Sequence, residues 1–287
     1  MEPTLRQEFP ILEYDPSPGA VIEPSKTVES LEGIDHCVLC YFRQVLEQLV
    51  SNGRATQVAM HGSEMGPLPL YTIEHDGRRV AVMQAPVGAP FAAALLEELI
   101  ARGLTKFVIC GGCGVLDRQI AVGHLLVPTS AVRDEGTSYH YLPPAREVNA
   151  DARVVQALVD VLTKHCHPYL LTKTWTTDAI YRETPALVRL RRSEGCLAVE
   201  MEAAAFMAVA EFRGVHLGQL LYAGDDISGE DWDHRGWQDR ASVRKEVFWL
   251  AVEACLSAEM TSIARGGFGS AESLKPTSTY SVAAFVC

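Results

Sequence analysis

Three short segments of this chain combine residue types that could act chemically on a bound ligand. They are the glycine-rich run at 110–114, the acidic run Val-Glu-Met-Glu at 199–202, and the adjacent carboxylates Asp225 and Asp226. We place all three beyond the carboxyl ends of strands, which is where open α/β sheets bind their ligands. The three segments are therefore the first candidates for a binding or catalytic site.

The glycine-rich run follows the apolar segment Phe107–Ile109. Gly111 and Gly112 would let a ligand approach the backbone closely, and their N–H groups could face an anion. The spacing of the glycines fits neither a Walker loop nor a dinucleotide fingerprint. A tight strand-to-loop turn that binds no ligand is the alternative interpretation.

The acidic run contains Glu200 and Glu202, at the start of an apolar helix that we expect over 199–212 and that ends at Gly214. Carboxylates in a first helical turn commonly stabilise the helix dipole. Residues two apart on a helix do not share a face, so the two glutamates should have different roles. One of them is a candidate for binding sugar hydroxyls.

Asp225 and Asp226 directly follow a strand expected at 217–223. One of two adjacent carboxylates can lose its solvent and keep a proton near neutral pH, and such a group can act as a general acid. An ordinary acidic loop is the alternative. The acidic residues that follow do not have the spacing of a calcium loop, so we expect no metal.

The eight cysteines include two C-x-x-C pairs, Cys37/Cys40 and Cys110/Cys113. We expect the first pair on one face of an apolar helix over 37–50, where buried free thiols are common. The second pair lies in the glycine run, whereas a redox motif would open a helix. A zinc site made by both pairs would require them to be adjacent in space.

Composition narrows the class of protein. The chain has 287 residues, of which 48% are hydrophobic and 21% charged, and its formal net charge is −11. An acidic chain without a basic stripe is not expected to bind nucleic acid or an anionic membrane. The sequence contains no membrane-length apolar run and begins without a secretory signal, so we expect a cytoplasmic protein with reduced thiols.

Strand-like and helix-like segments alternate along the chain. We expect strands at 79–83, 107–110, 124–128, 170–175 and 217–223, and helices at 90–102, 37–50, 152–164, around 189–192, 199–212 and 239–256. This alternation favours an α/β protein, a three-layer α/β/α sandwich with a central mixed β-sheet, over a barrel. We expect a single domain over 1–262 and a loosely ordered tail over 263–287.

Taken in order, these segments resemble the nucleoside phosphorylase family, which contains purine and uridine phosphorylases and related nucleosidases. The run at 199–205 (Val-Glu-Met-Glu-Ala-Ala-Ala) looks like the most specific motif of that family, and Gly224-Asp225 stands in the place of its purine-specific Ser-Asp pair. The segment Trp175–Tyr181 is similar to the one that lines the base pocket. The runs 131–141, 88–90 and 111–114 match in position, and the resemblance spans roughly residues 10–258.

The resemblance implies an enzyme that cleaves the N-glycosidic bond of a nucleoside, with a purine as the expected base. Met201 and Glu202 would hold the ribose, and Asp225 would protonate the departing base under the guidance of Arg240 or Arg235. The remaining expected substrate-binding residues are Glu200, Trp175, Asp178, Tyr181, Gly88, Gly111 and Gly112, with Trp175 or Tyr181 covering the base. No cofactor is implied except inorganic phosphate as a co-substrate.

The sequence departs from this family where phosphate would bind. The family's Gly-Asp-Pro-x-Arg segment corresponds to Tyr14–Pro18, where Pro18 stands in place of the arginine. At the glycine-rich run, Ile109 stands in place of a second phosphate-binding arginine, and Gly112 in place of a Ser or Thr. A phosphate needs cationic, bidentate donors. Loss of both arginines should weaken its binding by several kcal/mol, at about 1.5–3 kcal/mol per charged hydrogen bond. Arg54, Arg133 and Arg182 are candidate substitutes.

Three alternatives therefore stay open. The acceptor is phosphate, or it is water, in which case the protein is a nucleosidase with Glu13, Asp15 or Glu64 as a base. The third alternative is a non-catalytic protein that binds or stores nucleosides. The resemblance also implies a homo-oligomer, a dimer or a hexamer, with the segment from Cys37 and the region around His61 as candidate contacts.

Overall fold

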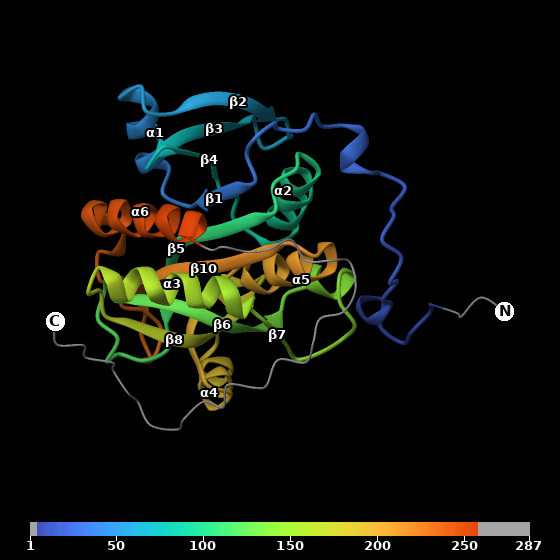
Figure 1. Cartoon of the computed structure of the whole chain (residues 1–287). Helices are drawn as coiled ribbons and strands as arrows, with labels where there is room; N and C mark the ends of the chain where they lie inside the picture. The colour runs from blue at the N-terminus through green and yellow to red at the C-terminus, as the bar shows by residue number, and fades with distance from the viewer. Residues whose placement is uncertain (1–4, 258–287) are drawn as a thin grey trace.

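The computed structural model of the chain describes residues 5–257, which form a ten-stranded mixed sheet covered by helices (Figure 1). The strands are β1 (His36–Cys40), β2 (Thr56–His61), β3 (Leu68–His75), β4 (Arg78–Gln84), β5 (Lys106–Val115), β6 (Leu125–Asp134), β7 (Glu147–Asn149), β8 (Tyr169–Thr177), β9 (Cys196–Glu200) and β10 (His216–Asp226). The α-helices are α1 (Arg43–Ser51), α2 (Ala89–Ala101), α3 (Ala152–Lys164), α4 (Pro185–Ser193), α5 (Ala203–Arg213) and α6 (Ala241–Ser257). Short 3-10 helices are η1 (Pro10–Leu12), η2 (Pro24–Lys26), η3 (Thr137–His140), η4 (Ile180–Arg182) and η5 (Trp237–Asp239).

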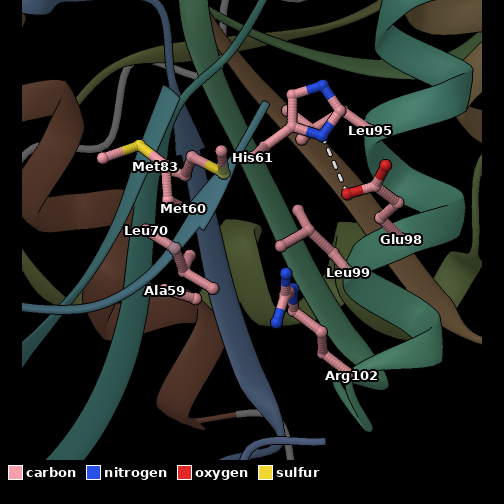
Figure 2. Close-up of a pocket in the computed structure, with 9 residues that line it drawn as sticks. All are labelled: Ala59, Met60, His61, Leu70, Met83, Leu95, Glu98, Leu99 and Arg102. Carbon is pink, nitrogen blue, oxygen red and sulfur yellow. Dashed lines mark hydrogen bonds and ion pairs between the residues drawn. The ribbon is translucent and has the colours of Figure 1, made fainter. Parts of the chain in front are cut away.

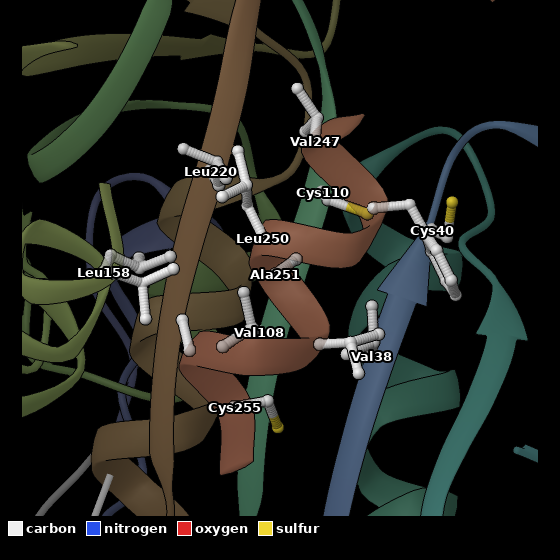
Figure 3. Close-up of a cluster of buried hydrophobic side chains, with 14 of the residues drawn as sticks. Val38, Cys40, Val108, Cys110, Leu158, Leu220, Val247, Leu250, Ala251 and Cys255 are labelled. Atoms are coloured by element: carbon white, nitrogen blue, oxygen red, sulfur yellow. The ribbon is translucent and has the colours of Figure 1, made fainter. Parts of the chain in front are cut away.

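Two apolar cores, one on each face of the sheet, hold the layers together. Helices α1, α3 and α6 contribute to the first core, and α2 and α5 pack against each other in the second. In Figure 3, Leu250 and Ala251 of α6 lie beside Val108 and Val38 of the sheet. The expected α/β architecture, with a central mixed sheet between helical layers, is confirmed.

Part of the sheet also closes on itself, which the alternation of elements did not reveal. Strand β10 pairs with β5 in parallel and with β6 in antiparallel orientation. Strand β6 pairs with β8, β8 with β9, and β9 with β5, so these five strands form a closed ring. The ring brings the ends of β9 and β10 to the same strand, β5.

The helix predicted over 37–50 begins only at Arg43, because residues 36–40 form β1 in the middle of the sheet. Val38 and Cys40 enter one core, whereas Cys37 and Leu39 enter the other. A parallel strand buried on both faces has an almost continuous apolar sequence, which a helical pattern can imitate. Cys37 and Cys40 therefore face opposite layers and cannot share a metal.

The glycine-rich run was predicted to form a turn, but it is the second half of β5. Gly111 and Gly112 are paired with Leu221 and Tyr222 of β10. A Cβ on Gly111 would lie only 2.8 Å from Cδ2 of Tyr41. Gly111 is required there because a side chain packs directly on the strand, as glycine in a strand often indicates.

The apolar helix predicted from residue 199 also begins later than expected. Residues 196–200 form β9, and α5 starts at Ala203 after a bend at Met201 and Glu202. The helix ends as predicted at Gly214, whose left-handed conformation (φ 69°) suits glycine. Glu200 is therefore the last residue of a strand, and Glu202 is the residue that precedes the helix.

Six cysteines are buried free thiols: Cys37, Cys40, Cys110, Cys113, Cys196 and Cys255. Burial raises the pKa of the Cys37 and Cys110 thiols well above their usual range, which makes them poor metal ligands and nucleophiles. Within residues 5–257, no three His, Cys, Asp or Glu side chains are grouped to hold a metal ion. The expected domain boundary at 262 and the tail over 263–287 lie outside the described residues.

No helix within the described part of the chain has both the length and the apolar composition that a membrane span requires.

Candidate active site

Glu202 is held at the point where the first turns of α2 and α5 meet. Its side chain is 5% exposed, and its Oε1 accepts a hydrogen bond from the backbone N–H of Gly88 at 2.5 Å. Gly88 precedes α2 with a φ of 98°, a conformation that favours glycine. Gly88 thus fixes the direction of the Glu202 carboxylate, and its expected contact with substrate stays a prediction.

Glu200 is held by hydrogen bonds from its own surroundings. Its Oε1 accepts from the Thr176 hydroxyl at 2.6 Å, and its Oε2 accepts from the N–H groups of Glu202 at 2.8 Å and Ala203 at 2.6 Å. Burial and then the charge of Glu202 raise the pKa of Glu200 to about 7. Both carboxylate oxygens accept hydrogen bonds near the start of α5, so Glu200 supports that helix, and its expected contact with substrate stays a prediction.

Two further groups lie around Glu202. Burial, with a smaller contribution from the charge of Asp178, raises the pKa of Glu202. Asp178 is itself fixed by the N–H of Gly136, which donates to its Oδ2 at 2.9 Å. The Tyr41 hydroxyl is buried beside Glu202, and burial followed by the charges of Glu202 and Glu200 raises its pKa well above the usual range.

Asp225 and Asp226 end β10 in different surroundings. Asp226 is 4% exposed and accepts hydrogen bonds from Arg235 Nη2 at 2.6 Å and from the Ser228 N–H at 2.8 Å. Asp225 is half-buried, and its Oδ2 accepts from the indole Nε1 of Trp232 at 2.7 Å. Asp226 is therefore tied to its own loop, whereas Asp225 is presented beside an aromatic side chain.

The arginines expected to steer Asp225 have other partners. Arg235 binds Asp226, and Arg240 Nη2 donates to the backbone carbonyl of Arg235 at 3.2 Å. The residue that contacts Asp225 is Trp232, which corrects the expected role of Arg235 and Arg240. An indole close to two aspartates in an acidic loop was the signal in the sequence.

Gly114 brings the two acidic runs together. It is paired with Val199 of β9, and a Cβ on it would lie 3.6 Å from Oδ1 of Asp225. Burial, followed by the charges of Glu200 and Asp225, raises the pKa of the neighbouring Cys113 thiol well above its usual range. The two strand ends that the sequence could only list separately thus form one acidic site.

Glu183 is a site residue that sequence reasoning did not select. Burial and then the charge of Asp225 raise its pKa to about 7. Leu187 of α4 and Ile227, which follows β10, pack on one buried cluster. The three residues between Tyr181 and α4 carry no recognisable pattern, so only the fold reveals this proximity.

The two aromatic residues expected to cover a base are placed differently from each other. Trp175 is completely buried in β8, and its Nε1 donates to Asp134 Oδ2 at 2.9 Å. It cannot cover a base, because strand alternation directs its side chain into the core. Tyr181 is 96% exposed on η4, so its expected role stays a prediction. Met201 lies half-buried between the two glutamates.

The proposed substitutes for the phosphate-binding arginines are mostly occupied. The buried Arg133 donates to the Ser138 hydroxyl and to the carbonyls of Pro143 and Leu142. The Arg54 guanidinium lies 4.7 Å from the centre of the Trp249 ring. Arg182 is exposed on η4.

A small pocket between β2 and α2 is a separate feature (Figure 2). It is lined by Ala59, Met60, His61, Leu70, Met83, Leu95, Glu98, Leu99 and Arg102. His61 Nδ1 lies 2.8 Å from Glu98 Oε2, as the dashed line in Figure 2 marks. The acidic groups at the ends of β9 and β10 belong to a different part of the fold.

Comparisons with known proteins agree on the fold. A family model described as "Phosphorylase superfamily" matches residues 35–257. The chain is 31% identical to the guanosine phosphorylase of Halorubrum lacusprofundi over 179 residues, which make up 60% of this chain and 74% of that protein. It is 26% identical to the uridine phosphorylase of Thermococcus kodakarensis over 196 residues, 64% of this chain and 71% of that protein.

Two solved structures are similar at lower identity. The AMP nucleosidase of Bacteroides thetaiotaomicron superposes with a TM-score of 0.63 at 22% identity, covering 77% of this chain and 86% of that chain. A uridine phosphorylase of Vibrio fischeri superposes with a TM-score of 0.66 at 20% identity, covering 80% and 95%. The family match begins at residue 35, so the expected counterpart of a phosphate segment at Tyr14–Pro18 falls outside it.

Proposed function

Since the chain belongs to the phosphorylase superfamily, we propose that it cleaves the N-glycosidic bond of a purine nucleoside. The observation that carries the proposal is that Gly114 pairs with Val199 of β9 and lies against Asp225, which brings the ends of β9 and β10, and so the two acidic runs, together. Glu202 is fixed by a backbone amide and Asp225 by an indole, as a site for a sugar and a base requires. The relatives named as guanosine and purine nucleoside phosphorylases support a purine base.

Glu202 and Met201 bind the ribose in this proposal. Oε1 of Glu202 is occupied by the Gly88 amide, which leaves Oε2 to accept a hydrogen bond from a ribose hydroxyl. Cleavage builds positive charge on the sugar, as in glycoside hydrolysis. The buried Glu202 and Glu200, with the exposed Asp178 acting on Glu202, stabilise that charge more in the transition state than in the substrate.

Asp225 gives a proton to a ring nitrogen of the departing purine. The C1′–N9 bond breaks, its electron pair stays on the base, and the proton neutralises the base as it leaves. Proton transfer from a positioned side chain contributes roughly 10²–10⁴-fold to the rate of such reactions.

Two observations bear on the acceptor that attacks C1′. The names of the relatives indicate phosphate. The charges of this chain favour water, because Arg133 is occupied, Ile109 is buried in the core, and the groups around Glu202 are acidic. Inorganic phosphate is therefore the co-substrate to test, and no other cofactor is proposed.

The test incubates the purified protein with guanosine, inosine, adenosine and uridine, each with and without inorganic phosphate. Free base must appear with at least one purine nucleoside. Ribose 1-phosphate that appears only with phosphate identifies phosphorolysis, whereas free ribose in both conditions identifies hydrolysis. Binding of nucleosides, seen as a higher melting temperature, without any product would overturn the proposal in favour of a binding or storage protein.

We also propose a homo-oligomer, a dimer or a hexamer, in the cytoplasm. The region around His61 is the candidate contact, since Met60 and Met65 are exposed there by 43% and 83%. Single apolar residues are common on surfaces, but two methionines beside an edge strand suit a contact between subunits. Light scattering of the purified protein tests the oligomeric state.

A further inference from the structure

Arg244, in the first turn of α6, is a half-buried cation without an anionic partner among the described residues. Its Nε donates to the Tyr222 hydroxyl at 3.0 Å, and that hydroxyl donates in turn to the carbonyl of Trp237 at 2.9 Å. Charges that are removed from water are normally paired with an opposite charge, because their desolvation is costly. The unpaired guanidinium therefore marks a place where an anion can bind.

Three aromatic rings hold the Arg244 guanidinium in place. Its Cζ lies 5.4 Å from the centre of the Trp237 ring, 5.6 Å from that of Phe42 and 5.9 Å from that of Tyr222. A cation within about 6 Å of a ring centre is attracted to the face of the ring. The rings and the Tyr222 hydroxyl use only Nε, and neither Nη group has a hydrogen-bond acceptor in the described part of the chain. Both Nη groups can therefore make the paired hydrogen bonds that a phosphate accepts.

Arg244 and Asp225 lie over the same face of β5. Arg244 is anchored on the Tyr222 hydroxyl, which lies 3.4 Å from a Cβ placed on Gly112. Oδ1 of Asp225 lies 3.6 Å from a Cβ placed on Gly114. Residues two apart in a strand share a face, and at roughly 3.3 Å per residue they are about 7 Å apart. An anion on Arg244 is therefore close to the carboxylate that is proposed to protonate the base.

The loop that follows β1 connects Arg244 to the proposed ribose site. Phe42, whose ring faces the guanidinium, comes directly after Tyr41. The Tyr41 ring packs on Gly111 of β5, and its hydroxyl lies beside Glu202. Two successive residues of one loop thus contact the proposed anion site and the carboxylate that is proposed to bind the ribose.

Arg240, one turn before Arg244, adds positive charge to this region. Its carbonyl accepts the Arg244 N–H at 3.0 Å, and its own Nη2 donates to the Arg235 carbonyl at 3.2 Å. Neither Arg240 nor Arg244 forms an ion pair with a carboxylate of residues 5–257. Like charges one helical turn apart repel each other, and a bound anion would relieve that repulsion.

We propose that Arg244 binds the phosphate group of a substrate, with Arg240 adding to the positive charge. This inference rests on the proposed function and deepens it, because the phosphate is either the inorganic acceptor or the 5′-phosphate of a nucleotide. As the acceptor, a phosphate oxygen bonds to C1′ while the electron pair of the C1′–N bond passes to the base. The base takes its proton from Asp225, which regains one from the solvent.

The first test measures binding and does not depend on activity. Melting temperatures of the wild type, Arg244→Gln and the control Lys245→Gln, which removes a charge from the exposed next residue, are compared at constant ionic strength with inorganic phosphate, guanosine and guanosine 5′-monophosphate. Stabilisation by inorganic phosphate that only Arg244→Gln loses identifies the free anion as the ligand. Stabilisation by the monophosphate beyond that by guanosine, again lost only in Arg244→Gln, identifies the 5′-phosphate. Equal stabilisation of Arg244→Gln and the wild type, or none by either phosphate, would overturn the inference.

Kinetics then separates a binding role from a structural one. For the phosphate-bearing substrate that the first test identifies, Arg244→Gln should raise KM about tenfold or more, because a charged hydrogen-bond donor is lost. Arg244→Lys keeps the charge but not the paired donors, so it should recover only part of this loss. An unchanged KM in Arg244→Gln would overturn the inference. Phosphate binding that depends on Arg244, in a protein that cleaves no nucleoside or nucleotide, would support the inference and refute the proposed function.

Discussion

The two acidic pairs of the site, Glu200 with Glu202 and Asp225 with Asp226, have a common plan. In each pair one carboxylate is tied into the scaffold and the other is presented to the site. Glu200 is held by hydroxyls and backbone amides, and Asp226 by Arg235 and a backbone amide. The presented members, Glu202 and Asp225, are oriented by uncharged donors, the Gly88 amide and the Trp232 indole.

The pairs differ in what balances the charge of the buried carboxylate, Asp226 in one pair and Glu200 in the other. Asp226 has a cationic partner, whereas Glu200 has only dipoles, so burial and Glu202 raise the pKa of Glu200 to about 7. The start of α5 therefore carries negative charge without a cationic partner, which suits a sugar that becomes positively charged during cleavage. At the end of β10, the ion pairs among the described residues join Arg235 to Asp226 and Asp233 and do not include Asp225, which suits a proton donor.

The largest effect should come from the presented member of the β10 pair. Asp225→Asn leaves the size and the Trp232 contact in place but cannot supply a proton, so base release should fall by about 10²-fold or more. Product analysis by chromatography measures the rate, and circular dichroism checks the fold. Unchanged turnover in Asp225→Asn would contradict the proposal that Asp225 supplies the proton to the departing base.

The scaffold member of the same pair should affect stability instead. Arg235→Met leaves the buried Asp226 carboxylate without its cation and should lower the free energy of unfolding by about 3 kcal/mol. Urea denaturation measures this loss. The double variant Arg235→Met/Asp226→Asn should recover part of it, and a double variant as unstable as the single one would contradict the explanation.

In the other pair, Glu202→Gln should weaken ribose binding. Replacing a charged acceptor by a neutral one costs about 1.5–3 kcal/mol, which corresponds to a loss of roughly 10- to 150-fold in kcat/KM. Steady-state kinetics with the best nucleoside measures it. Glu200→Gln is the matched control: it should lower the melting temperature more than Glu202→Gln does, and the reverse order would show that the two roles are exchanged.

The smallest effect concerns the pH dependence of stability. The pKa of Glu200 is raised from 4.5 to about 7 in the folded chain, so the folded state binds this proton more tightly than the unfolded state. The free energy of unfolding should therefore fall as pH rises from about 4.5 to about 7. Denaturation of Glu200→Gln over this range should show a shallower fall, and a slope equal to that of the wild type would argue against the assignment.

Much of the fold could be predicted because amphipathic helices and turn residues are local signals. The helices at 90–102 and 152–164 and the stop at Gly214 were found for that reason. The errors at 37–40 and 199–200 have one cause. Strands buried on both faces have no polar side to give them a period of two, so the pattern of apolar residues did not separate them from helices.

Part of the candidate site could be chosen from the sequence. Glu202, Asp225 and Gly88 could be selected by type and motif, whereas Trp175 could not be excluded because a buried aromatic residue and a ligand-covering one look alike in sequence. Trp232 was missed because its hydrogen bond to Asp225 depends on how the acidic loop folds.

By itself the sequence determined the alternation of strands and helices, the acidic charge, and the two carboxylate pairs of the candidate site. Only the tertiary structure decided which member of each pair faces the site. That choice depends on donors that lie far away along the chain, such as Thr176 for Glu200 and Gly88 for Glu202. A buried carboxylate takes its role from the donors that reach it, and closure of the sheet around β5 is what brings those donors within reach.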